Sequence, residues 1–287
     1  MNPDTLATSL NHRVISFTQK PYPYRTSHHL DELDVELDGG AQLKLLLKDL
    51  SRTNLVSDAK RAKPEFLHNP MREAEAYHLL ADTDLGAPIL YASGHDWLLL
   101  EKVPGRELWQ SADVRTWAAA ARWAARLHEC FASRPPSANH LLRYDATFFG
   151  LWPERAHMLH PEIKPIVARY NRVIEILATL PVTMIHGEFY PSNILVGAQE
   201  RISPVDWEMS GVGPGVLDIA ALASGWAEPE ATAILDAYGA VTNDALEAAR
   251  IHLSLQWLGW SEDWTPPPEH ARDWLDEAMR AAEKLGL

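Results

Sequence analysis

The first hundred residues carry short runs in which apolar and polar positions alternate, the pattern of strands buried on one face. Residues 29–40 (HLDELDVELDGG) alternate and end in two glycines, and residues 41–50 (AQLKLLLKDL) follow at once. Two such runs joined by glycines predict a β-hairpin. Residues 87–93 and 96–105 predict a second pair of strands.

Helical spacing interrupts this region once and then dominates the rest of the chain. Residues 69–82 (NPMREAEAYHLLAD) place a proline in the first turn and acids early, which is typical of a helix N-terminus. Residues 113–132 begin with Asp113, a good N-cap, and then repeat apolar residues at helical spacing. Residues 161–180 and 228–283 are also predicted to be mainly helical.

Short apolar strands are predicted inside the helical part, at residues 182–188, 193–197 and 202–208. The pattern therefore predicts an α+β fold, in which a small antiparallel sheet precedes a mainly helical region with a β insert. We predict two lobes, residues 1–100 and 106–287, joined by a hinge at 101–105. A cleft between lobes is a usual place for a ligand.

Composition narrows the functional class. The 287 residues carry a net charge of −13 without any run of Lys or Arg, which argues against a nucleic-acid binder and is compatible with a cationic substrate. The single cysteine, Cys130, excludes a disulfide framework and a multi-cysteine zinc site. There is no apolar run of about 18 residues and no signal-peptide pattern, so we expect a cytoplasmic protein without a membrane span.

Candidate chemistry is concentrated at residues 186–195 (HGEFYPSNIL). His186, Glu188 and Asn193 stand at relative positions 0, +2 and +7, the spacing of the kinase loop H-x-D-x-x-x-x-N. Asp206 follows thirteen residues after Asn193, at the end of an apolar strand. Asp and Asn supply the oxygen ligands that Mg²⁺ prefers. The structural alternatives are a turn residue for Asn193 and a strand cap for Asp206.

These segments resemble the aminoglycoside phosphotransferase and choline kinase family, whose members are relatives of protein kinases. Residues 186–195 match the catalytic loop of the family except at Glu188, where the family has Asp, and residues 204–208 (PVDWE) match its metal motif. Residues 125–131 and 215–220 match a recurrent helix and the segment whose aspartate supports the loop. The resemblance spans roughly residues 15–225 in the order of the family, and it implies a bilobal protein-kinase-like fold.

The resemblance also implies a nucleotide site for ATP with Mg²⁺. It assigns Lys48 to the phosphates and Glu73 to an ion pair with that lysine, although Lys44 and Glu75 are rivals by pattern alone. The implied hinge contacts to adenine come from backbone groups of Glu101 and Val103, and the implied phosphate turn contains Thr26 and Ser27. The metal ligands would be Asn193 and Asp206, and His186 would hold the loop in place.

The acceptor is expected at the C-terminal end of the chain. The candidate residues are Trp257, Trp260, Glu262, Asp263 and Trp264. Aromatic faces and carboxylates together suit a cationic small molecule that carries a hydroxyl. The alternative is that the tryptophans pack the C-terminal helices.

Glu188 decides between two functional hypotheses. Glu and Asp carry the same charge, with reference pKa values of about 4.3 and 3.9, and they differ in length by one methylene. Because the other implied site residues are all in place, we predict an active phosphotransferase that moves the γ-phosphoryl group of ATP to a small-molecule hydroxyl. The alternative is a nucleotide-binding pseudokinase that acts as a binding or regulatory module. A protein kinase is disfavoured, since no A-P-E segment follows residues 205–208 (VDWE).

Overall fold

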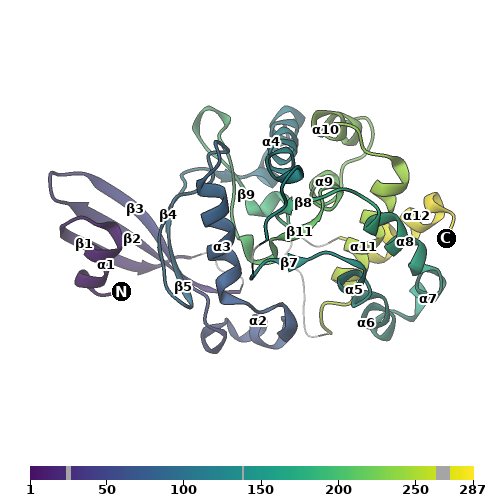
Figure 1. Cartoon of the computed structure of the whole chain (residues 1–287), viewed down its shortest axis with the longest axis horizontal. Helices are drawn as coiled ribbons and strands as arrows, with labels where there is room; N and C mark the ends of the chain where they lie inside the picture. The colour runs from purple at the N-terminus through teal and green to yellow at the C-terminus, as the bar shows by residue number, and fades with distance from the viewer. Residues whose placement is uncertain (24–26, 138, 263–271) are drawn as a thin grey trace.

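The computed structural model describes residues 1–23, 27–137, 139–262 and 272–287, and these form a mixed α+β fold (Figure 1). The N-terminal part is a five-stranded antiparallel sheet in the order β1-β2-β3-β5-β4. Its strands are β1 (Val14–Pro21), β2 (His29–Leu37), β3 (Gln42–Asp49), β4 (Leu90–Ser93) and β5 (Trp97–Glu101). Both predicted strand pairs are therefore confirmed.

Three helices accompany this sheet. The predicted helix is α3 (Pro70–Ala81), which begins after Asn69, whose side chain accepts a hydrogen bond from the Met71 backbone N–H. The sequence pattern missed α1 (Pro3–Leu10) and α2 (Ser57–Ala62). Leu6 and Leu10 of α1 pack with strand residues in a small apolar core. Helix α3 lies between the sheet and the helical part of the molecule (Figure 1).

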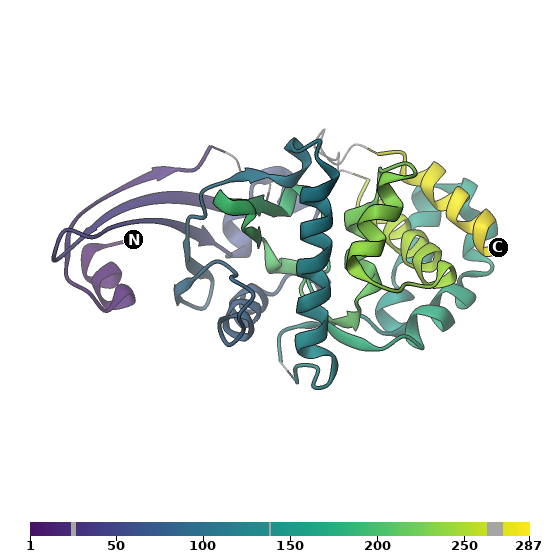
Figure 2. The same cartoon turned by 90° about the horizontal axis from the view of Figure 1, so that it is seen from above.

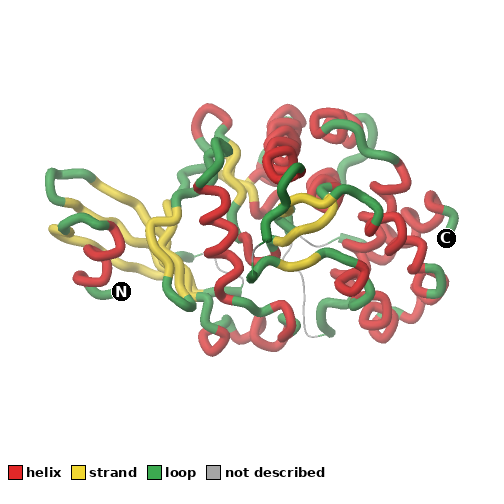
Figure 3. Tube along the Cα trace, viewed as in Figure 1, coloured by secondary structure: helices red, strands yellow, loops and turns green. Residues whose placement is uncertain are grey.

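The C-terminal part is mainly helical (Figure 3). Its helices are α4 (Val114–Ala132), α5 (Ala146–Phe149), α6 (Trp152–Leu159), α7 (Lys164–Val167), α8 (Tyr170–Ala178), α9 (Val216–Ala223), α10 (Glu230–Tyr238), α11 (Asn243–Leu258) and α12 (Trp274–Leu285). Asp113 caps α4 as predicted, because its carboxylate accepts from the Arg115 backbone N–H at 3.0 Å. Seen from above, α4 crosses the middle of the molecule (Figure 2).

Two small three-stranded sheets, β10-β9-β6 and β7-β11-β8, lie within the helical part. Their strands are β6 (Arg106–Glu107), β7 (Leu142–Arg143), β8 (Val182–Ile185), β9 (Ile194–Val196), β10 (Ile202–Pro204) and β11 (Gly211–Pro214). The chain passes directly from β5 into β6, which pairs with β9. A side chain at Gly105 would meet the Val196 carbonyl oxygen at 2.6 Å, so this link requires glycine.

The α+β fold with an antiparallel N-terminal sheet is thus confirmed, while the division into lobes at 101–105 stays a prediction. Within the described ranges, no helix is both long enough and apolar enough to span a membrane. The short strands matter most for the site, since β8, β9 and β10 bring residues 186–195 and 205–208 beside the end of β3.

Candidate active site

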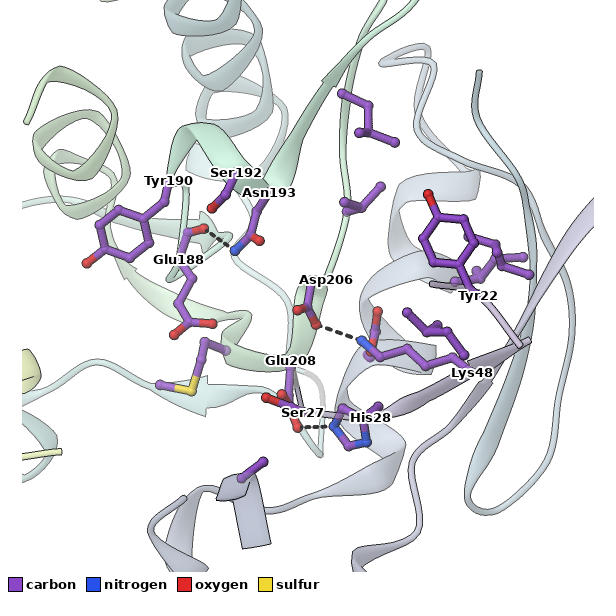
Figure 4. Close-up of a pocket in the computed structure, with 18 of the residues that line it drawn as sticks. Tyr22, Ser27, His28, Lys48, Glu188, Tyr190, Ser192, Asn193, Asp206 and Glu208 are labelled. Atoms are coloured by element: carbon purple, nitrogen blue, oxygen red, sulfur yellow. Dashed lines mark hydrogen bonds and ion pairs between the residues drawn. The ribbon is translucent and has the colours of Figure 1, made fainter. Parts of the chain in front are cut away.

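A cavity of about 630 Å³ collects most of the residues that the sequence predicted for the site (Figure 4). The predicted residues that line it are Ser27, Lys48, Glu73, Glu101, Val103, Glu188, Asn193, Asp206, Trp257 and Trp260. They come from the N-terminal sheet and its connecting segments, from α3, from the loops after β8 and β10, and from the end of α11 and the residues that follow it. Thr26, Asp263 and Trp264 lie outside the described residues.

Lys48 joins two carboxylates at the centre of this cavity. Its Nζ lies 2.7 Å from Glu73 Oε2 and 2.6 Å from Asp206 Oδ1. Burial alone would lower the pKa of Lys48, but Asp206 and Glu73 raise it well above its ordinary value. The ammonium group is therefore held charged where a phosphate chain needs a cation.

The two rival residues lie elsewhere. The Lys44 side chain is 70% exposed, and its Nζ lies 3.9 Å from Asp34. Glu75 accepts hydrogen bonds from the backbone N–H groups of Asn139 and His140. The geometry therefore favours Lys48 and Glu73 for the ion pair.

The loop after β8 is fixed mainly by buried hydrogen bonds. The Asp218 carboxylate, in the first turn of α9, accepts from the backbone N–H groups of His186 at 2.8 Å and Gly187 at 2.9 Å. Gly187 has φ +83°, and a Cβ there would lie 2.2 Å from the Met209 carbonyl oxygen. Only glycine satisfies both conditions, so the geometry requires glycine at position 187.

His186 supports this loop through its ring nitrogens and lies outside the cavity lining. Its Nε2 lies 3.0 Å from the Val205 carbonyl oxygen, which only accepts, and its Nδ1 faces the Glu188 backbone N–H at 3.3 Å, which only donates. These partners select the neutral tautomer with its proton on Nε2. Complete burial also lowers the pKa of His186.

A backbone hydrogen bond joins the segments that carry Asn193 and Asp206. The Val205 N–H donates to the Asn193 carbonyl oxygen at 2.8 Å, and the Asn193 Nδ2 donates to the Glu188 carbonyl oxygen at 3.0 Å. The second bond leaves Oδ1 as the acceptor atom of the Asn193 amide. Asp206 has φ 63°, a left-handed conformation that Asp tolerates better than most residues. Burial opposes its ionisation, but Lys48 lowers the pKa of Asp206.

Glu188 points into the same cavity (Figure 4). Desolvation raises the pKa of Glu188 to about 8, and the charges of Asp206 and Glu208 act in the same direction. The carboxyl group is thus poised to exchange a proton near neutral pH.

The remaining predicted residues have mixed surroundings. The Glu101 backbone N–H is bonded to the Ile89 carbonyl oxygen, and its side chain pairs with Arg201 at 3.0 Å. Val103 is buried and lines the cavity. Glu262 is exposed and is not part of the cavity lining.

Trp257 and Trp260 both pack and line the cavity. The indole N–H of Trp257 donates to the Tyr190 hydroxyl, and its ring stacks on Trp274 with centroids 5.5 Å apart. Trp260 stacks on Trp152 at 5.9 Å. The packing alternative and the acceptor-pocket interpretation are therefore compatible.

Among the ionisable residues of the cavity that sequence reasoning missed, His28, Lys63 and Glu208 contact one another. Glu208 was visible as the acid two residues after Asp206, within PVDWE. His28 and Lys63 gave no local signal, because each acquires its meaning from a contact more than a hundred residues away.

Comparison with known proteins agrees with this fold. A sequence model of the phosphotransferase enzyme family matches residues 36–252. No curated protein sequence matches the chain. Solved structures do match over nearly the whole chain, at low sequence identity.

Three of these structures are informative. A protein described as a candidate fructosamine-3-kinase from Thermobifida fusca has a TM-score of 0.65 at 17% identity, with coverage of 99% of this chain and 97% of that one. The choline kinase LicA from Streptococcus pneumoniae has a TM-score of 0.59 at 16% identity, with coverage of 99% and 96%. The ternary complex of APH(2″)-IIa with streptomycin and ATP has a TM-score of 0.58 at 11% identity, with coverage of 99% and 95%.

The kinase-like fold places a lysine between two carboxylates in its cavity, which is in keeping with a phosphotransferase. The match over residues 36–252 takes in most of the chain, and the chain belongs to the phosphotransferase enzyme family.

Proposed function

We propose that this enzyme transfers the γ-phosphoryl group of ATP, with Mg²⁺, to a hydroxyl group of a small molecule. The observation that carries the proposal is the bridge from Lys48 to Glu73 and Asp206, in one cavity with Glu188 and Asn193. Phosphoryl transfer requires these groups, a cation on the phosphates, oxygen ligands for the metal and a carboxylate at the acceptor. The APH(2″)-IIa relative binds ATP, which supports the choice of nucleotide.

The side chains present fit a magnesium ion. Asp206 and Asn193 offer carboxylate and amide oxygens on the same side of the cavity (Figure 4). No cluster of three or more His, Cys, Asp or Glu suited to a metal occurs among the described residues. Mg²⁺ usually takes one or two protein ligands and completes its shell with phosphate oxygens and water. A bound Mg²⁺ would neutralise charge on the phosphate oxygens.

The chain's own residues then position the reactants. Lys48 holds the phosphates, and Glu73 holds Lys48. The acceptor oxygen attacks the γ-phosphorus while the bond from that phosphorus to the β–γ bridging oxygen breaks, and ADP leaves. The hydroxyl proton passes to Glu188. The residues 1–100 would hold the nucleotide, the hinge 101–105 its adenine, and residues 106–287 the acceptor.

The acceptor lies beside Glu188, where Tyr190, Trp257 and Trp260 also line the cavity. A cationic acceptor would gain from the aromatic faces. It would also lower the raised pKa of Glu188 and so favour the ionised form that accepts a proton. The choline kinase and APH(2″)-IIa relatives act on or bind cationic molecules, which supports this class of acceptor.

The test is acceptor-dependent release of ADP from ATP by the purified protein with Mg²⁺, screened over amines, amino sugars and macrolides. We expect Asp206→Ala to reduce this release by at least about a thousandfold, because the metal and Lys48 both lose a partner. Asp84→Ala serves as the control, because its side chain is 86% exposed at the surface. Undiminished turnover in Asp206→Ala would contradict the site assignment.

The pseudokinase alternative predicts a different result for the same screen. It expects metal-dependent binding of ATP without stimulation of ADP release by any acceptor. Acceptor-dependent turnover by the wild type rules it out.

A further inference from the structure

Three ionisable side chains that the transfer mechanism leaves unused form a cluster in the cavity wall. The Glu208 carboxylate contacts Lys63 Nζ closely, and its Oε1 lies 2.8 Å from His28 Nε2. The side chains of Glu208, Lys63 and His28 are only 11%, 7% and 3% exposed. All three residues line the same cavity as Lys48 and Glu188.

His28 lies between two hydrogen-bond acceptors. Its Nδ1 lies 2.9 Å from the Asp49 carbonyl oxygen, and its Nε2 lies 2.8 Å from Glu208 Oε1. The Glu208 carboxylate therefore has the Lys63 ammonium group and the His28 ring as its two partners.

The cluster lies where the transferred group must pass. Glu208 is close enough to Lys48 and to Glu188 to raise the pKa of both. Figure 4 shows the Glu208 side chain in the space between Glu188 on one side and Lys48 and His28 on the other. In-line transfer places the γ-phosphoryl group between the phosphate-binding lysine and the carboxylate at the acceptor.

The main chain beneath Glu208 is anchored separately from its carboxylate. The buried Arg72 donates from Nη1 to the Glu208 carbonyl oxygen and to the Leu67 carbonyl oxygen, both at 2.8 Å. The carboxylate can therefore rotate away from Lys63 and His28 without moving the backbone. A buried cation left without its anion is costly, so a departing carboxylate must be replaced by another anion.

We propose that Lys63 and His28 bind the γ-phosphoryl group of the nucleotide, and that Glu208 is the internal anion that this group displaces. The inference rests on the proposed function, since it needs ATP in the cavity. A phosphoryl group accepts hydrogen bonds from Lys and His side chains as a carboxylate does, so the exchange leaves both Lys63 and His28 with a partner. The segment from α2 to α3 thereby supplies a second cation to the phosphates, in addition to Lys48.

The test compares the equilibrium binding of ATP and of ADP, in EDTA, to the wild type and to Lys63→Met, by titration calorimetry. ADP lacks only the γ-phosphoryl group, so the ratio of the two affinities isolates that group. We expect Lys63→Met to weaken ATP binding about tenfold or more and to change ADP binding by less than about threefold. Lys60→Met is the matched control, because it removes the same charge from an exposed position on α2.

The variant Glu208→Gln should change ATP affinity in the opposite direction. Removing the competing carboxylate charge should tighten ATP binding in EDTA several-fold and leave ADP binding unchanged. Equal losses for ATP and ADP in Lys63→Met, or weaker ATP binding in Glu208→Gln, would overturn the proposal and assign the cluster a structural role.

Different results would contradict this inference and the proposed function. If the wild type binds ATP and turns it over with an acceptor, while Lys63→Met keeps the wild-type ratio of ATP to ADP affinity, then only this inference fails. If the wild type binds neither nucleotide, the proposed function fails and this inference fails with it.

Discussion

Glu188 is one methylene longer than the aspartate implied by the family resemblance, and its surroundings explain how the longer side chain is used. The loop that carries it is fixed by Asp218 and Gly187, so the backbone cannot retreat to compensate. The extra length instead carries the carboxyl group further into the cavity, where desolvation raises its pKa to about 8. A charged aspartate closer to the loop would be a different acid–base group, not an equivalent one.

The raised pKa of Glu188 makes a prediction about stability that is independent of turnover. In the unfolded chain this carboxyl group loses its proton near the ordinary value of 4.5, whereas the folded protein retains the proton up to about pH 8. Stability therefore falls as pH rises through this window. We expect Glu188→Gln to be more stable than the wild type, with a difference in Tm that is small at pH 5 and grows toward pH 8.5.

The same variant should lose activity. The neutral amide cannot accept the acceptor proton, so we expect turnover to fall on the order of a hundredfold. Thermal melts in EDTA at several pH values, together with the ADP-release assay, measure both effects. Glu175→Gln, an exposed position on α8, is the control for the loss of one charge. A constant Tm difference across pH would show that Glu188 is not desolvated as described.

At the scale of elements, the sequence predicted the helices and strands whose ends are marked by characteristic residues. Gly39 and Gly40 have φ values of +92° and +83° in the hairpin turn, and Asp113 caps α4, so each signal had a direct structural cause. Strand β11 was missed because its sequence, GVGP, resembles a turn. A Cβ at Gly211 would lie 2.6 Å from the Tyr144 ring, so packing, not strand propensity, selects that glycine.

The residues of the candidate site likewise fall into those that the sequence predicted and those that it did not. Residues with fixed spacing in the chain, such as His186, Glu188 and Asn193, were found from the sequence and were brought into one loop. The ion pairs of Glu208 join it to residues 180 and 145 positions away, and no local periodicity reports such contacts. The acceptor role of Trp257 and Trp260 stays a prediction, since both tryptophans also stack on other rings as ordinary packing residues do.

Asp218, in the first turn of α9, gives a prediction about the loop that carries Glu188. Asp218 accepts two backbone N–H groups, and an asparagine has only one acceptor oxygen for them. Asp218→Asn therefore leaves one buried N–H unsatisfied, which should cost about 1–3 kcal/mol of stability. Because the loop positions Glu188 and Asn193, we also expect kcat to fall more than tenfold, while the ADP affinity in EDTA stays close to the wild-type value.

Urea unfolding, steady-state kinetics and ADP titration separate these effects. Asp236→Asn, an exposed acid on α10, is the matched control. Loss of ADP affinity in parallel with kcat would contradict a role confined to the loop.

At the scale of the whole molecule, one apolar core runs through both parts of the chain. Tyr77 and Leu80 of α3 and Leu98 of β5 belong to the same buried cluster as the residues of α4 and α11. The outer face of the sheet has a separate small core with α1. The predicted lobes therefore share their packing along α3, and any change in their separation must keep α3 in place or break this core.

His252 lies in the middle of that core and gives a prediction for the acid stability of the whole molecule. The ring is completely buried on α11, its Nδ1 lies 2.9 Å from the Tyr170 hydroxyl, and Phe149 packs on it with centroids 4.8 Å apart. Burial lowers the pKa of His252 to about 3. The unfolded chain binds a proton near the ordinary value of 6.5, while the folded protein does not, so stability is lost as pH falls from about 6.5 toward 3.

We expect His252→Asn to flatten this loss, because the amide keeps a polar atom near Tyr170 and cannot take up the proton. The variant should be less stable than the wild type at pH 7.5, and the gap should narrow or reverse by pH 4.5. Urea unfolding at several pH values measures it, with His12→Asn at an exposed position as the control. Parallel curves for the variant and the wild type would mean that the acid sensitivity of the core arises elsewhere, and His186, whose pKa is also lowered by burial, would be the next histidine to replace.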